Sequence, residues 1–252
     1  MNNFTSFQDW NYLFTSNNTD KWVTYEAVSE TNQIPDVLPQ EIADNEWLLR
    51  PRINLYTVVG KRCIDIAASL FVIVFILAWL TPIIALLIYL DSSGPFYFIQ
   101  IRTGQQGKTF PCLKFRTMTH ISVNTEFRQT LKNDSRVTRV GQFLRRTNLD
   151  EMLQFINVLL GDMTLVGPRP HAIDHDAIYW TSKAYRARYL VKPGITGLAQ
   201  TRGARGATTH PQSMSNRVRY DHFYITNQTF MLDMKICLAT VVSTLQGDTN
   251  AW

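Results

Sequence analysis

The stretch that decides the fold is residues 66–90, IAASLFVIVFILAWLTPIIALLIYL, which contains no charged side chain. A segment this long and this apolar predicts a helix that enters a lipid bilayer. The alternative is a helix buried inside a soluble protein, which can have the same composition. We expect the membrane helix, because few soluble domains need an apolar segment of this length.

Pro82 lies inside this segment, directly after Thr81. Proline removes a backbone donor and kinks or breaks a helix. It leaves arms of about 24 Å before it and about 12 Å after it, at 1.5 Å per residue. Both arms are shorter than the ~30 Å hydrocarbon core of a bilayer. We therefore expect a re-entrant helix that bends at Thr81 and Pro82. A tilted, kinked span is the alternative.

Basic side chains flank the apolar segment on both sides. They are Arg50, Arg52, Lys61 and Arg62 before it, and Arg102, Lys108, Lys114 and Arg116 after it. Because basic residues tend to stay on the cytoplasmic side, we expect both ends of the helix in the cytoplasm. The K-R-x-x-D spacing of Lys61, Arg62 and Asp65 allows an ion pair within one helix. These three residues suit either an ion pair at the membrane interface or a basic site that binds a lipid phosphate.

Charge divides the chain unevenly. The net charge is +5, although residues 1–50 contain eight acidic and only two basic side chains. We expect an acidic, loosely ordered tail over 1–50, an interfacial and re-entrant membrane helix over 51–91, and a cytoplasmic catalytic domain over 92–252. A basic body suits a phosphate ligand, an anionic lipid surface or nucleic acid. We expect no nucleic acid, because the apolar segment has no role in such a protein.

The remaining chain predicts a mixed fold. YFIQIR (97–102) and TFPCLKFR (109–116) are typical of two strands joined by the turn RTGQQGK. An amphipathic helix is expected over 149–160, ending at Gly161. LVGPRP and KPGITG predict loops, 172–190 a helix, and 215–246 a last helical stretch with a possible interruption. The fold class is therefore α+β, mostly α, with one catalytic domain behind an N-terminal re-entrant membrane helix.

Two adjacent carboxylates, Asp150 and Glu151, follow two arginines at the start of the helix expected over 149–160. One interpretation is a capping box, with Asn148 as N-cap and Glu151 three residues later. The other is chemical, because adjacent helical residues point about 100° apart. One carboxylate can then attack while the other holds a metal ion. With Arg145 and Arg169 nearby, the pair suits a phosphate and Mg²⁺.

A second cluster follows at His171, Asp174, His175 and Asp176. Two histidines four residues apart on a helix are able to bind a metal ion. We expect instead surface or loop histidines near the site, with His171 in reach of the substrate.

As a set, the motifs resemble the bacterial sugar transferases, the monotopic polyprenyl-phosphate phosphoglycosyl transferases. Besides the apolar segment, the resemblance rests on KRCID (61–65), LKFRTM (113–118), DSRVTRVGQFLRRTNLDE (134–151), GDMTLVGPRPH (161–171), KPGITGLAQ (192–200) and RVRYDHFYI (217–225). The PRPH and KPGITG motifs look most like the branch that transfers glucose- or galactose-1-phosphate for exopolysaccharide.

The resemblance implies a reaction and its partners. A hexose-1-phosphate would pass from UDP-glucose or UDP-galactose to undecaprenyl phosphate, with release of UMP. The enzyme would sit among inner membrane lipids of a bacterium, with its catalytic domain on the cytoplasmic face. It would use Mg²⁺. An N-acetylated amino sugar in place of the hexose is an alternative.

The resemblance also implies a role for each matching residue. Asp150 would be the nucleophile, through a covalent phosphosugar intermediate, and Glu151 the Mg²⁺ ligand. The substrate phosphates would be bound by Lys114, Arg145 and Arg169. The membrane bend would be set by Thr81 and Pro82, with Lys61, Arg62 and Asp65 at its base. Further candidates are His171, Asp221 and Tyr224, of which the last two fall in a matching motif without an assigned task.

One departure from the family pattern concerns Met152 and Leu153, which stand where the family usually has Leu-Pro. Proline is compatible with a helix start but is not required there, so we expect the fold to survive. The departure keeps one other class open, a non-catalytic membrane-anchored relative that binds nucleotide sugar.

Overall fold

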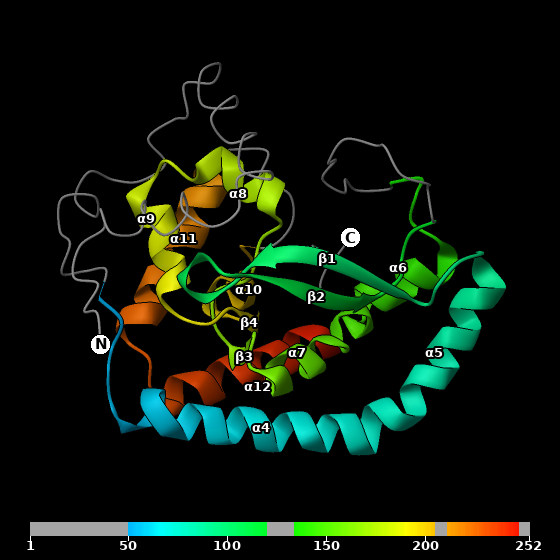
Figure 1. Cartoon of the computed structure of the whole chain (residues 1–252), viewed down its shortest axis with the longest axis horizontal. Coiled ribbons are helices and arrows are strands. Elements are labelled where there is room, and N and C mark those ends of the chain that lie inside the picture. Colours follow the sequence, from blue (N-terminus) through cyan, green and yellow to red (C-terminus); the bar gives the residue numbers. More distant parts are fainter. Residues whose placement is uncertain (1–49, 120–133, 205–210, 247–252) are drawn as a thin grey trace.

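The computed structural model describes residues 50–119, 134–204 and 211–246 (Figure 1). Over these residues the chain is mostly helical, with two small two-stranded sheets. The predicted α+β class with a majority of helices is therefore confirmed. The predicted acidic tail lies outside the described residues, apart from Arg50.

One helix runs without a break from Tyr56 to Asp91, over 36 residues. It comprises η2 (Tyr56–Gly60) and η3 (Ile73–Leu77), which are π-helical, and α4 (Lys61–Val72) and α5 (Ala78–Asp91). Figure 1 shows that its direction changes between α4 and α5. Pro82 lies inside α5, and a proline close to a π-helical turn is a sufficient cause of a bend. The helix therefore bends between α4 and α5, one turn before Pro82, and it does so without breaking.

The long helix has one buried and one exposed face. The buried residues are Asp65, Ser69, Leu77, Ile84 and Ile88. The exposed large apolar residues are Val58, Val59, Ile66, Leu70, Phe71, Val74, Phe75, Ile76, Trp79, Ile83, Leu86, Leu87, Tyr89 and Leu90. By length and composition the helix is able to cross a membrane, and only 17% of its most apolar window is buried. So large an exposed apolar face marks an interaction surface.

Both ends of the long helix are attached to the same body. Near its start, Arg62 donates from its two terminal nitrogens to the carbonyls of Val158, at 2.7 Å, and Leu159, at 2.8 Å. At its end, the Asp91 carboxylate accepts a 2.9 Å hydrogen bond from the Val140 amide. The helix therefore curves around the body and returns to it.

The first sheet is an antiparallel hairpin of β1 (Tyr97–Thr103) and β2 (Thr109–Phe115). The turn between them contains the 3₁₀ segment η4 (Gln105–Gly107), where Gly107 has a φ of +72° that glycine adopts without strain. The predicted hairpin and its turn are confirmed.

The second sheet pairs β3 (Thr164–Val166) with β4 (Gly194–Thr196) in parallel. The sequence predicted only loops at LVGPRP and KPGITG, and this was wrong for their strand residues. Three-residue strands are too short to show a periodic pattern. Their close approach depends on glycine, because a Cβ on Gly194 would lie 2.1 Å from the Gly167 nitrogen.

The segment that carries the acid pair is less regular than predicted. Helix α6 (Arg139–Arg146) is followed by a 3₁₀ turn, η5 (Leu149–Glu151), and then by α7 (Gln154–Leu160). The expected single helix over 149–160 is therefore wrong in its first turn. Gly161 ends α7 with a φ of +97°, as the sequence predicted.

The remaining helices complete the body around the two sheets (Figure 1). They are α8 (Ile173–Tyr179), α9 (Lys183–Arg186), the 3₁₀ segment η6 (Ala187–Leu190), α10 (Leu198–Thr201), α11 (Pro211–Thr226) and α12 (Phe230–Gln246). The helix expected over 172–190 is thus divided into three. The expected interruption in the last stretch is confirmed, since it lies between Thr226 and Phe230.

Candidate active site

The acid pair lies in the η5 turn, which packs against the long helix. Leu149 before the pair and Met152 after it pack against a core cluster that includes Leu77 of the long helix. Apolar contacts on both sides therefore fix the two carboxylates. Leu153 has a φ of −63°, the value that proline imposes, and it is buried in the same cluster. The departure from Leu-Pro thus leaves this turn intact.

The capping-box interpretation of the pair is wrong. Asn148 adopts the left-handed conformation, with a φ of +54°, and its side chain makes no cap hydrogen bond. Its amide instead donates to the Thr244 hydroxyl at 3.3 Å. The Glu151 side chain turns to Lys114 and Arg169 rather than back to the turn.

Glu151 is held by two cations from different elements. Lys114 Nζ, on β2, lies 2.6 Å from Glu151 Oε1. Arg169, in the loop after β3, donates to both carboxylate oxygens, with 3.0 Å between Nη1 and Oε2. Burial alone would raise the pKa of Glu151, but Arg169 and Lys114 hold it well below its usual range. Glu151 is therefore a carboxylate at neutral pH.

The pKa of Asp150 is shifted in the opposite direction, upward. Within the described residues its carboxylate accepts no hydrogen bond, and the residue is only 8% exposed. Burial raises the pKa of Asp150 to about 6, and the neighbouring charge of Glu151 adds to this, while Lys114 and Arg145 oppose it. An unpartnered, poorly solvated carboxylate that still ionises near neutral pH suits a nucleophile.

Arg145, at the end of α6, is the third predicted phosphate-binding residue. Its Nε donates to the Thr117 hydroxyl at 2.9 Å. Its charge acts on Asp150, as noted above. The structure therefore gathers Lys114, Arg145 and Arg169 around the acid pair.

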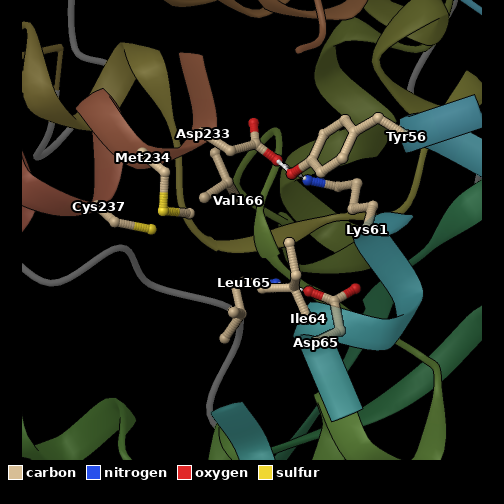
Figure 2. Close-up of a pocket in the computed structure, with 9 residues that line it drawn as sticks. All are labelled: Tyr56, Lys61, Ile64, Asp65, Leu165, Val166, Asp233, Met234 and Cys237. Carbon is tan, nitrogen blue, oxygen red and sulfur yellow. Dashed lines mark hydrogen bonds and ion pairs between the residues drawn. The ribbon is translucent and has the colours of Figure 1, made fainter. Parts of the chain in front are cut away.

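Of the residues predicted at the base of the membrane helix, Lys61 and Asp65 line the pocket shown in Figure 2, whereas Arg62 binds carbonyls of α7. Lys61 Nζ lies 2.5 Å from Asp233 Oδ2 and donates to the Tyr224 hydroxyl at 2.9 Å. Asp65 accepts from the Thr164 hydroxyl at 3.0 Å and from the Leu165 amide at 2.9 Å. These side chains thus tie α4 to α12, α11 and β3.

Instead of the ion pair that the K-R-x-x-D spacing allows, these side chains bind groups of the body. Lys61, Arg62 and Asp65 each bind a different partner there, because they lie on the face of the helix that packs against it. Tyr224 belongs to the same group, since its hydroxyl donates to the Val166 carbonyl and lies 2.8 Å from Asp233 Oδ1.

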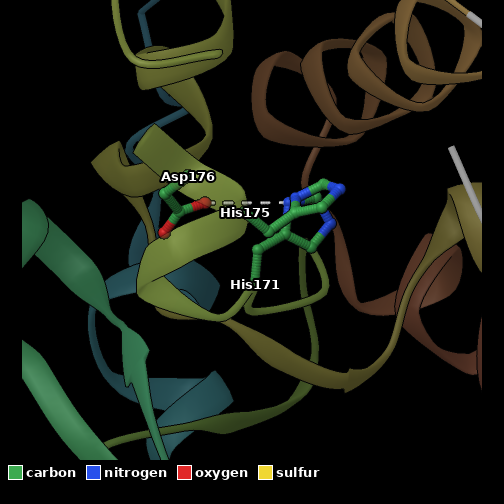
Figure 3. A group of neighbouring side chains, drawn as sticks. All are labelled: His171, His175 and Asp176. Carbon is green, nitrogen blue, oxygen red and sulfur yellow. Dashed lines mark ion pairs between the residues drawn. The ribbon is translucent and has the colours of Figure 1, made fainter. Parts of the chain in front are cut away.

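His171, His175 and Asp176 lie together, as Figure 3 shows, with possible ligand atoms within 4.8 Å of one another. All three are buried, so the histidines are not at the surface, but His171 lies in the loop before α8, in agreement with the loop alternative. Burial lowers the pKa of both histidines, and Arg188 and Arg217 lower it further. Arginines beside neutral histidines oppose a metal cation at this place.

The same cluster is internally bonded. Asp176 Oδ1 accepts hydrogen bonds from the hydroxyls of Tyr185 and Tyr189, both at 2.5 Å. His171 Nδ1 lies 2.6 Å from the Tyr185 hydroxyl. The group is therefore better described as a buried polar network than as a metal centre.

Asp221 pairs with Arg188, a residue that the sequence did not single out. Arg188 Nε donates to Asp221 Oδ2 at 2.7 Å, and both side chains are almost completely buried. The pair joins η6 to α11, and its two residues are 33 positions apart in the chain. A single arginine in an ordinary helical segment carries no local signal of such a partner.

The charges around the acid pair suit a phosphate-bearing ligand. Residues 56–247 match the bacterial sugar transferase family, and the chain belongs to this family. The resemblance found in the motifs is thereby confirmed.

Two relatives are 45% identical to this chain. Over 190 residues it matches the UDP-glucose:undecaprenyl-phosphate glucose-1-phosphate transferase of Klebsiella pneumoniae, which covers 75% of this chain and 41% of that protein. Over 192 residues it matches the exopolysaccharide production protein PSS of Rhizobium leguminosarum bv. phaseoli, which covers 74% of this chain and 96% of that protein. The chain thus spans less than half of the first relative and nearly all of the second.

A more distant relative is named for another sugar. The UDP-N-acetylgalactosamine-undecaprenyl-phosphate N-acetylgalactosaminephosphotransferase of Aeromonas hydrophila is 36% identical over 188 residues, which covers 74% of this chain and 44% of that protein.

Proposed function

We propose that this protein transfers a hexose-1-phosphate from a UDP-sugar to undecaprenyl phosphate, as the first membrane step of exopolysaccharide synthesis. The observation that carries the proposal is the contrast between two adjacent carboxylates. Among the described residues, Asp150 is buried without an ion-pair partner, whereas Glu151 is ion-paired with Lys114 and Arg169. The name of one similar relative states this type of transfer, and the name of another refers to exopolysaccharide production.

The reaction takes two displacement steps at one phosphorus atom. An Asp150 oxygen attacks the sugar-bearing phosphorus of the UDP-sugar, and the bond from that phosphorus to the UMP oxygen breaks. This gives an aspartyl phosphosugar and UMP. An oxygen of the lipid phosphate then attacks the same phosphorus, and the bond to Asp150 breaks. The carboxylate is regenerated, so the sequence is ping-pong.

The basic residues offset the charge of the pyrophosphate. Lys114 and Arg169 now neutralise Glu151, and incoming phosphates would compete for the same cations. Glu151 oxygens released in this way suit Mg²⁺, which prefers a few carboxylate oxygens together with substrate phosphates. The donor set therefore fits this ion. Bound Mg²⁺ would neutralise charge on the transferring phosphoryl group.

We also propose that the long helix is re-entrant, with the catalytic domain on the cytoplasmic face of the inner membrane. Arg62 and Asp91, near opposite ends of the helix, are both hydrogen-bonded to the one body. A hydrocarbon core of ~30 Å would separate the two ends of a simple span. The outer side of α12 adds exposed apolar side chains for the same membrane surface, namely Met231, Leu238, Val241 and Val242.

Glucose is the sugar that the relatives favour. Relatives named for UDP-glucose are 44–46% identical to this chain, whereas the relative named for UDP-N-acetylgalactosamine is 36% identical. Galactose and N-acetylated amino sugars are therefore second candidates. A non-catalytic binding role is the alternative of another class, but the intact η5 turn around Asp150 favours catalysis.

UMP release tests this function. Purified protein in detergent would receive undecaprenyl phosphate, Mg²⁺ and one of several UDP-sugars, namely UDP-glucose, UDP-galactose, UDP-N-acetylglucosamine or UDP-N-acetylgalactosamine. We expect release with UDP-glucose and none from Asp150→Asn. Folded protein that releases no UMP with any donor would exclude the reaction, and a phosphosugar trapped on another residue would exclude Asp150 as nucleophile.

A further inference from the structure

The loop that carries Arg169 is held in place by hydrogen bonds that its backbone carbonyl oxygens accept from other segments. Four successive carbonyls each accept a hydrogen bond from outside the loop: Pro168 from the Gly194 amide at 2.9 Å, Arg169 from Arg188 Nη2 at 2.9 Å, Pro170 from Arg102 Nη1 at 2.8 Å, and His171 from the Thr103 amide at 3.3 Å. Two of the four donors are arginine side chains. The position of the loop therefore depends on side chains as well as on strand pairing.

Arg188 makes the most extensive of these contacts. Its guanidinium also binds Asp221 through Nε, at 2.7 Å, and lies 2.9 Å from His171 Nδ1 through Nη1. Because the guanidinium plane is rigid, these two partners fix the direction of the Nη2–H that reaches the Arg169 carbonyl. The residue is 2% exposed, so water does not compete for these bonds.

A contribution to folding stability does not by itself explain why a charged arginine is buried at position 188. Taking a guanidinium out of water is costly, and a buried ion pair often contributes no more than well-packed apolar side chains would. What the pair with Asp221 does provide is a fixed geometry directly behind Arg169. On its other side, the Arg169 side chain is paired with Glu151.

We propose that Arg188 is a positioning residue for the transfer reaction and acts through the main chain of Arg169. By holding the Arg169 carbonyl, it sets the place of the Arg169 guanidinium against Glu151 and the substrate phosphate. This inference rests on the proposed function. Arg102 supports the same loop one residue later, through the Pro170 carbonyl.

The first test compares Arg188→Lys with Arg186→Lys. Lysine keeps the charge but lacks the rigid fork. Arg186 lies in the adjacent α9, and its Nε has no hydrogen-bond partner within the described residues, so its variant controls for local disturbance. We expect kcat for UMP release to fall about tenfold or more in Arg188→Lys. KM for the UDP-sugar should change by less than about threefold, and the control should keep both parameters.

The second test is a double-mutant cycle on an Arg169→Lys background. If Arg188 acts through Arg169, adding Arg188→Lys should reduce kcat by less than about twofold further. Independent losses that multiply would overturn the proposal. So would a loss in Arg188→Lys that matches its unfolded fraction, measured by thermal unfolding in the same detergent, or no loss at all.

Arg102→Lys provides the same test if Arg188→Lys does not fold. It frees the Pro170 carbonyl without leaving Asp221 unpaired. Its loss of kcat should likewise vanish on the Arg169→Lys background, and a loss that persists there would overturn the proposal. Inactive wild-type protein would instead be a failure of the proposed function, because the cycle requires wild-type turnover.

Discussion

Replacing Lys114 by methionine should move the pH dependence of UMP release. Lys114 Nζ lies 2.6 Å from Glu151 Oε1, and its charge is the largest one that lowers the pKa of Asp150. Methionine keeps the length of the side chain and removes the charge. The nucleophile must be ionised, so activity falls as pH drops below the pKa of Asp150. A higher pKa therefore moves the acid limb of the profile to higher pH.

The size of the shift follows from the structure. Burial and Glu151 raise the pKa of Asp150 to about 6 even with Lys114 present. An opposite charge within a few ångströms changes a carboxyl pKa by about 1–3 units, so the limb should move up by about 1–2 units in Lys114→Met. One unit corresponds to about 1.4 kcal/mol. At pH 7, a shift of about 1.5 units lowers the ionised fraction from about nine-tenths to about one quarter.

The assay is kcat/KM for UMP release between pH 5 and 9, at constant ionic strength and saturating Mg²⁺. Lys108→Met is the matched control, because Lys108 is an exposed lysine on the same hairpin. Its profile should overlay the wild-type profile. If Lys114→Met loses activity equally at every pH, with the limb unmoved, then Lys114 does not act on the ionisation of the nucleophile and the reasoning is refuted.

Three further predictions concern the metal, the topology and the second sheet. Glu151→Gln should raise the Mg²⁺ concentration needed for half-maximal UMP release at least about tenfold, since a neutral amide is a poorer ligand; an unchanged requirement would place the ion elsewhere. A cysteine at Ser92 should react with a membrane-impermeant maleimide in inverted but not in right-side-out vesicles, and the reverse pattern would establish a span. Gly194→Ala should lower the unfolding free energy by about 2 kcal/mol or more, because its Cβ would lie 2.1 Å from the Gly167 nitrogen. Gly60→Ala, whose Cβ would meet only the movable Tyr56 ring at 3.1 Å, should cost much less, and equal losses would contradict this account.

Much of the fold could be predicted from local pattern. The apolar segment over 66–90 became the long helix, and the two β-rich stretches became the β1–β2 hairpin. Gly161 ends α7 as expected. These features depend on periodicity, composition and backbone preference within a few residues, which a sequence displays directly.

The second sheet and the irregular acid turn could not be predicted in this way. β3 and β4 are three residues long and pair across about 30 positions of chain, so no local pattern marks them. At the acid pair, the composition suited a capped helix equally well. Packing of Leu149 and Met152 against the long helix, rather than propensity, favours the 3₁₀ turn there.

By itself, the sequence determined which residue types are available: the apolar helix, the adjacent acids and the basic residues in their motifs. Tertiary structure decided their partners. It directed Lys61 and Asp65 to the body rather than to each other, buried the histidines, and placed Arg188 behind the loop that carries Arg169. The physical reason is that a buried polar group needs a bonding partner, and the partner nearest in space is set by how distant segments pack.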